Sequence, residues 1–205
     1  RGFSPSTGTP NLSLLGEDLA KLVDNLSLSK VHLIGQSMGG WGSLVYALQE
    51  QNKVKSLIMC GSIGPAKNGE IDAIIASRDT AKSQKFVEEG VNLAAGKRMA
   101  VENSSLYFLY DEIGAINFTL DKDAIRKGLW NDRYLNDTKL SSLNIPVLCM
   151  SGEEDIITPP AAVKKLSSLL PNAQFILIPK TGHSVYFERP EIFNATIDRF
   201  LERVK

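Results

Sequence analysis

The chain has 205 residues, of which 43% are hydrophobic and 22% charged, a composition typical of an ordinary globular protein that needs no disulfide or structural metal. Its 23 basic residues balance 23 acidic ones and neither sign forms a long run, which argues against nucleic acid or an anionic membrane as a partner. No apolar stretch approaches the roughly 20 residues that cross a bilayer. The compartment and the oligomeric state stay open, with the cytoplasm favoured.

The first part of the chain alternates helices and strands. Leucines and a valine at helical spacing predict an amphipathic helix over 15–26, with Ser13 as its N-cap. The stretch VHLIG at 31–35 predicts a buried strand, a second helix follows from about Met38, and VKSLIMCGS at 54–62 predicts the next strand. A strand, a helix and a strand at this spacing predict a parallel unit with a right-handed crossover.

The same alternation returns near the end of the chain. We expect a strand at 145–152, a helix at 161–170, a strand at 174–182 and a last helix after Pro190. Cys60 and Cys149 lie in apolar strand-like runs, so we interpret both as small buried side chains.

Residues 63–142 interrupt this alternation, because they are richer in charge and in helix formers. They contain candidate helices at 73–79, 85–101 and 123–130. We therefore predict an α/β core formed by residues 1–62 and 143–205, with residues 63–142 inserted as a helical cap over one end of the sheet.

The stretch GQSMG at 35–39 has the pattern G-x-S-x-G between a predicted strand and a predicted helix, which is the pattern of a nucleophile elbow. Such a turn forces the backbone of Ser37 into a strained conformation. We expect side chains at Gly35 and Gly39 to collide with their neighbours. The Ser37 hydroxyl would then lie at the start of the helix, with the Met38 N–H as an oxyanion donor.

An activated serine needs a base, and the sequence contains only two histidines. His32 lies within the predicted strand before Ser37, where we interpret it as a packed structural residue. His183 follows the last predicted strand, and it would lie at the same end of the sheet as the elbow. We therefore predict that His183 is the base.

The base needs a carboxylate to fix its tautomer. The stretch SGEEDIITPP supplies three candidates just beyond another predicted strand. We select Asp155 and interpret Glu153 and Glu154 as solvated loop charges. The catalytic residues then follow in the chain order Ser, Asp, His.

Four motifs in order resemble the α/β-hydrolase superfamily, in its cap-inserted esterase and lactonase branch. The stretch at 1–8, RGFSPSTG, resembles the R-G-x-G-x-S loop, with Ser4 where a second glycine is usual. GQSMGG at 35–40 resembles the elbow, GEEDIITPP at 152–160 the acid loop, and GHSVYFERPEIF at 182–193 the histidine loop. The resemblance implies a mostly parallel sheet with a Ser37, Asp155 and His183 triad.

The resemblance also implies strands that this sequence does not contain, among them a segment that donates a second oxyanion N–H. A strand at 31–34 would then be an open sheet edge. We expect the 205-residue piece alone to aggregate and to lose about 100-fold to 1000-fold in kcat relative to a longer parent.

The triad predicts a chemistry rather than a substrate. Ser37 argues against haloalkane dehalogenases and epoxide hydrolases, which use a carboxylate nucleophile. The motifs are most similar to those of small-molecule esterases and enol-lactonases, so we predict cleavage of a small carboxylic ester or lactone through an acyl-enzyme. A carbon-carbon bond hydrolase, a thioesterase and a haloperoxidase are alternatives within the fold, and a non-catalytic ligand-binding protein is the alternative from another class.

No cofactor or metal is expected, because the sequence has no cluster with metal-ligand spacing, no G-x-G-x-x-G and no P-loop. The expected partner is a small-molecule acyl substrate. Aromatic residues of the insertion either line an acyl pocket or form the cap's own core; they are Trp130, Tyr110, Phe108 and Tyr107.

Overall fold

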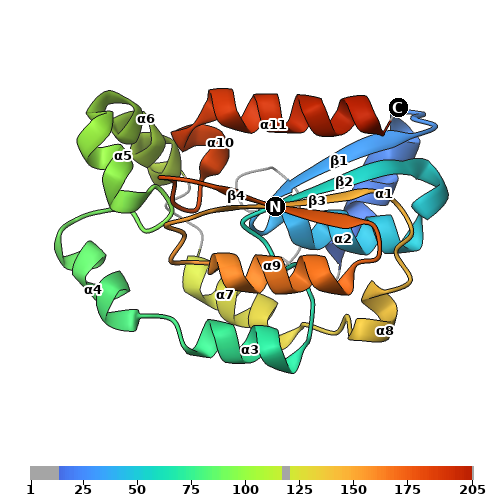
Figure 1. The fold of residues 1–205 in the computed structure, drawn as a ribbon, viewed down its shortest axis with the longest axis horizontal. Coiled ribbons are helices and arrows are strands. Elements are labelled where there is room, and N and C mark those ends of the chain that lie inside the picture. Colours follow the sequence, from blue (N-terminus) through green and yellow to red (C-terminus); the bar gives the residue numbers. More distant parts are fainter. Residues whose placement is uncertain (1–13, 117–120, 205) are drawn as a thin grey trace.

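The computed structural model describes residues 14–116 and 121–204, and within them four strands form one parallel sheet (Figure 1). The strands are β1 (Val31–Gln36), β2 (Val54–Cys60), β3 (Val147–Gly152) and β4 (Ala173–Ile178). They lie side by side in chain order, and each neighbouring pair is parallel. In the described part of the chain β1 is therefore an edge strand. The predicted parallel sheet is confirmed.

Helices cover both faces of the sheet (Figure 1). On one face lie α1 (Leu15–Asn25), α2 (Gly39–Gln49) and α9 (Pro160–Leu169), and on the other lies α11 (Pro190–Arg203). A short 3-10 helix at Gln51–Lys53 leads from α2 into β2. The predicted Ser13 cap of the first helix lies outside the described residues. Leu14 precedes α1 and makes no side-chain capping bond.

Two apolar cores, one on each face, hold these layers together. Leu57 and Met59 of β2 pack into the core shared with α1, α2 and α9, whereas Ile58 and Cys60 pack into the core shared with α11. Side chains of a strand alternate between faces, so a strand covered on both sides is a continuous apolar run. This requirement explains why the sequence of β2 is recognisable as a buried parallel strand.

Between β2 and β3 the chain is mostly helical. The helices are α3 (Gly69–Ala76), α4 (Thr80–Glu88), α5 (Gly96–Glu102), α6 (Ser104–Ala115), α7 (Lys122–Asn131) and α8 (Asp137–Leu140). Five of the six begin at a capping Asn or Asp whose side chain accepts backbone N–H bonds: Asn68, Asp79, Asn103, Asp121 and Asn136. Such caps satisfy N–H groups that have no partner within the helix.

The predicted single helix over 85–101 is wrong. Gly90, between α4 and α5, and Gly96, the first residue of α5, both adopt left-handed backbone conformations, with φ of 69° and 70°. Glycine is the residue that adopts this conformation without a steric penalty. The helix α6 was not among the predicted elements.

The inserted helices lie in two places. The helix α3 packs against α9, where Lys165 pairs with Glu70 at 2.7 Å. Arg133, two residues after α7, pairs with Asp72 of α3 and donates to the Trp130 carbonyl of α7. In contrast, α5 and α6 lie beside α10 (Val185–Glu188), next to the loop that follows β4 (Figure 1). Across residues 14–116 and 121–204, no helix combines the length and apolarity that a membrane span requires.

Candidate active site

Ser37 lies in a strained turn between β1 and α2. Its φ is 49°, which is the left-handed region that residues with a side chain rarely adopt. The Ser37 N–H donates to the Cys60 carbonyl at 2.9 Å, and the Ser37 carbonyl accepts from the Gly40 N–H at 3.1 Å. These bonds attach the turn to the end of β2 and to the first turn of α2, and they confirm the predicted strain at this serine.

Of the two glycines predicted to be sterically required around Ser37, one is confirmed and one is not. A Cβ added at Gly35 would lie 2.6 Å from the Gly40 Cα, so the predicted collision is confirmed at this position. A Cβ at Gly39 would meet no atom within 4 Å, and the prediction for Gly39 is wrong. Gly40 is the second constrained position, because a Cβ added there would overlap the Ser62 hydroxyl oxygen. In the first turn of α2, Gly40 therefore packs against Ser62, whereas Gly39 is exposed to solvent.

Asp155 and His183 are in direct contact. The Asp155 Oδ2 lies 2.8 Å from the His183 Nδ1, and each residue is 4% exposed. The Asp155 Oδ1 accepts the N–H groups of Ile157 and Thr158, both at 2.9 Å. A carboxylate has no proton to give, so the His183 Nδ1 carries the proton and Nε2 is left as the basic nitrogen.

Contacts from β1 and β2 place His183 next to the elbow. The Gln36 side-chain amide donates to the His183 carbonyl at 2.9 Å, and Gln36 directly precedes Ser37. Gly61, which follows β2 with φ 54°, packs so closely that a Cβ there would lie 3.1 Å from the His183 Nδ1. The residues that follow four parallel strands therefore meet at one end of the sheet, as parallel topology requires.

Sequence reasoning did not assign a role to Glu188, the last residue of α10. Glu188 is 5% exposed, and its carboxylate accepts the N–H of Gly182 at 2.8 Å and that of Ser184 at 3.2 Å. Burial raises the pKa of Glu188 to about 7. The available signal was its place in GHSVYFERP, five residues after His183.

The acid loop is tied to α5, which corrects the interpretation of Glu154 as a solvated charge. Arg98 of α5 binds the Glu154 carboxylate through its Nε at 3.0 Å and through a second guanidinium nitrogen. Arg98 also pairs with Glu102, which binds Arg189 at 2.6 Å. The Glu154 and Glu102 bonds raise the pKa of Arg98. Glu153 is exposed and accepts the N–H of Lys180 at 3.2 Å.

The aromatic residues of the insertion differ in their surroundings. Tyr110 of α6 hydrogen-bonds Ser184 at 2.7 Å and packs edge-on against Phe187, so it lies against the histidine loop. The Arg133 guanidinium instead packs over the Trp130 ring, with its central carbon 3.5 Å from the ring centroid. Phe108 is 65% exposed. The Tyr107 hydroxyl accepts the Asn92 N–H at 2.8 Å.

His32 is exposed, so its interpretation as a packed residue is wrong. Its Nδ1 lies 2.7 Å from the Ser56 hydroxyl oxygen on the neighbouring strand β2. Partial burial, together with the nearby charge of Lys55, lowers its pKa. The open edge predicted at 31–34 agrees with the position of β1 at the end of the described sheet, but the exposure of the His32 side chain was not predicted. Cys60 and Cys149 are both free and buried, as predicted, and burial raises the pKa of each thiol to about 12.

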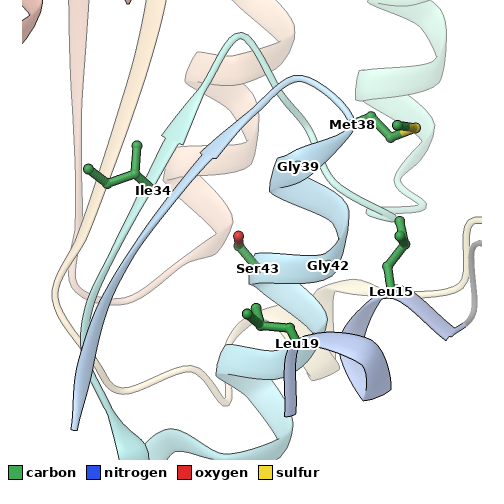
Figure 2. Close-up of a pocket in the computed structure, with 7 residues that line it drawn as sticks. All are labelled: Leu15, Leu19, Ile34, Met38, Gly39, Gly42 and Ser43. Atoms are coloured by element: carbon green, nitrogen blue, oxygen red, sulfur yellow. The ribbon is translucent and has the colours of Figure 1, made fainter. Parts of the chain in front are cut away.

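An open apolar hollow of about 260 Å³ lies beside the elbow, between α1, β1 and α2 (Figure 2). Its lining consists of Leu15, Leu19, Ile34, Met38, Gly39, Gly42 and Ser43. Neither Asp155 nor His183 belongs to it, so this hollow and the histidine contact are separate features. Within the described ranges, no group of three or more His, Cys, Asp or Glu side chains could hold a metal ion.

The geometry agrees with comparisons to known proteins. A family model described as the alpha/beta hydrolase fold matches residues 1–190, and the chain belongs to this family. It is 26% identical over 200 residues to a Caulobacter sp. (strain K31) protein provisionally named carbamate hydrolase RutD, covering 95% of this chain and 74% of the relative. It is 25% identical over 215 residues to the sn-1-specific diacylglycerol lipase ABHD11 of Mus musculus, covering 98% of this chain and 68% of the relative.

A solved structure has the same fold. The thermophilic esterase from Thermogutta terrifontis superposes with a TM-score of 0.74 at 24% identity, covering 100% of this chain and 78% of the esterase chain. The chain is thus a member of a family of hydrolases, with a histidine and an aspartate in contact beside a strained serine.

Proposed function

We propose that this protein is a serine hydrolase that cleaves a small carboxylic ester or lactone through an acyl-enzyme intermediate. The observation that carries the proposal is the buried contact of 2.8 Å between His183 and Asp155, with Gln36 linking the His183 backbone to the residue before Ser37. Family membership supports hydrolysis. The names of two relatives, a carbamate hydrolase and a diacylglycerol lipase, both refer to substrates with an acyl carbonyl.

In the proposed reaction the Ser37 Oγ bonds to the substrate's carbonyl carbon while the His183 Nε2 takes the hydroxyl proton. Asp155 stabilises the imidazolium that forms, because its Oδ2 faces the Nδ1 proton. The tetrahedral intermediate then collapses, and the leaving alkoxide receives the proton from His183. A water molecule attacks the acyl carbon with its proton passing to His183, and Ser37 recovers this proton when the acid leaves.

The Met38 N–H is the proposed oxyanion donor. Met38 precedes α2 directly, and the positive end of a helix dipole stabilises negative charge at this place. We also propose that residues 63–142 act as a cap that sets the choice of substrate. The contacts of Tyr110 with Ser184 and of Arg98 with Glu154 support this role for α5 and α6.

Active-site labelling of the protein tests the proposal. A fluorophosphonate probe should label the wild type and the Ser168→Ala variant, whose serine is exposed on α9, but not Ser37→Ala. With p-nitrophenyl acetate as substrate, replacing Ser37 or His183 should each lower kcat by about 1000-fold or more, and the double variant should lose little beyond that.

Labelling of Ser37→Ala at the wild-type rate would contradict the assignment of the nucleophile. If all variants label as expected but a panel of p-nitrophenyl esters, lactones and thioesters shows turnover of thioesters alone, the triad stands and the ester or lactone assignment is wrong. Stoichiometric labelling without turnover of any substrate would favour a ligand-binding protein.

A further inference from the structure

One buried carboxylate holds the loop that carries His183. Glu188 Oε2 accepts the Gly182 N–H at 2.8 Å, and Oε1 accepts the Ser184 N–H at 3.2 Å. These are the peptide groups immediately before and immediately after the N–H of His183. The two bonds therefore span the residue from which the imidazole reaches Asp155.

The surroundings keep the Glu188 carboxylate in this place. The Glu188 N–H donates back to the Ser184 carbonyl at 2.9 Å, so backbone and side chain bind the same residue. A Cβ at Gly182 would lie 3.1 Å from Oε1, which shows how closely the loop approaches the carboxylate. The Arg189 guanidinium is directed to the Glu102 carboxylate and to the Glu188 carbonyl, so it does not compete for the Glu188 side chain.

We infer that Glu188 is a positioning residue for His183, an inference that rests on the proposed function of His183 as the base. Hydrogen bonds to an ionised carboxylate are stronger than neutral ones, and a buried N–H without an acceptor is costly. Loss of either bond would let the loop shift by tenths of an ångström or more. Because Asp155 and Ser37 belong to other loops, such a shift changes the two hydrogen-bond distances on which proton transfer depends.

The protonation state of Glu188 gives this role a measurable signature. Its pKa of about 7 reflects burial first, which the two backbone N–H bonds and Arg189 oppose, and the charge of Asp155 raises it further. Tyr110 of α6 also faces Glu188. A protonated carboxyl has one weakened acceptor oxygen, so the hold on the loop weakens as the pH falls through about 7.

Protonation of Glu188, which loosens the loop of His183, should therefore lower kcat in addition to the loss of the base in acid. For the wild type we expect the acid limb of log kcat against pH to be steeper than a slope of one over the pH range just below 7, in which Glu188 takes up its proton. The Glu188→Gln variant keeps the shape of the side chain but presents an N–H₂ to one of the two backbone donors. In this variant the slope should fall to one, with kcat reduced roughly 10-fold to 100-fold and KM changed by less than about threefold.

The matched control is Glu202→Gln, the same change on the exposed face of α11, which should behave as the wild type. Measurements use the full-length protein, p-nitrophenyl acetate for kcat and KM, and a fluorophosphonate for the labelling rate of Ser37. Far-ultraviolet circular dichroism reports whether Glu188→Gln is folded. If it is not, the acid limb of the wild type alone decides, and a slope of one overturns the inference.

The test separates the two proposals. Suppose that labelling is lost in Ser37→Ala and His183→Ala but is normal in Glu188→Gln, and that the acid limb of log kcat for the wild type has a slope of one. This outcome would leave the proposed function intact and refute the positioning role of Glu188. Labelling that persists in Ser37→Ala would refute the proposed function, and the inference about Glu188 with it.

Discussion

The Gly35→Ala substitution tests whether close packing holds Ser37 in place. The added Cβ would lie 2.6 Å from the Gly40 Cα and 2.7 Å from the Gly40 nitrogen, whereas ordinary contacts lie at 3.4–4 Å. Both atoms belong to the backbone of α2, so no side-chain rotation can relieve the overlap. Either β1 or the first turn of α2 must move by roughly 1 Å, and Ser37 lies between them.

Two effects of measurable size follow. Overpacking of this kind costs about 1–3 kcal/mol, which lowers the Tm of a chain of this length by roughly 3 to 10 °C. A displacement of the nucleophile by roughly 1 Å should lower kcat by about 100-fold. The labelling rate of Ser37 with a fluorophosphonate should fall with kcat, because both report the approach of the same oxygen.

The control is Gly39→Ala, the other glycine of the pentapeptide. A Cβ there meets nothing within 4 Å, and Gly39 is the first residue of α2. Alanine restricts the unfolded chain more than glycine does, so this variant should be more stable by about 0.4–1 kcal/mol. Calorimetry and labelling on both variants check the pair. Equal Tm and equal labelling in Gly35→Ala and Gly39→Ala would refute the reasoning from packing.

Three further outcomes are expected. Asp155→Asn keeps the Oδ1 bonds to Ile157 and Thr158 but puts an N–H₂ opposite the His183 Nδ1. We expect kcat with p-nitrophenyl acetate to fall by about 10⁴-fold while the circular dichroism spectrum stays that of the wild type. A loss of kcat below tenfold would contradict the role of Asp155. Arg98→Ala removes partly exposed ion pairs, so calorimetry should show a small loss of Tm that disappears at high salt. Burial raises the pKa of Glu188 in the folded state to about 7, above its ordinary value of 4.5, so between these values the folded state binds more protons than the unfolded chain. The free energy of unfolding should therefore fall as the pH rises, by roughly 3 kcal/mol in total. Denaturant titrations of the wild type and of Glu188→Gln should show this difference in pH dependence, and parallel pH curves would argue against it.

The sequence by itself determined the sheet, the elbow and the candidate residues, because each depends on neighbours along the chain. The apolar runs of β2 and β3 predict buried parallel strands, since a strand covered on both faces has no polar side. The strained turn at Ser37 is also local, since it depends on a glycine next to a strand and a helix. Ordinary reasoning about bases and acids then selected His183 and Asp155, which the fold brings into contact.

Only the tertiary structure decided which residues support this arrangement, because those contacts join segments far apart in the chain. Glu154 meets Arg98 across 56 residues, and Gln36 meets the His183 carbonyl across 147. No local pattern shows that Gly40 rather than Gly39 faces Ser62, or that the His32 side chain is left exposed. Periodicity and spacing describe one segment at a time. Steric contact, burial and the pKa of a carboxylate depend instead on which residues of other segments lie next to the group in question.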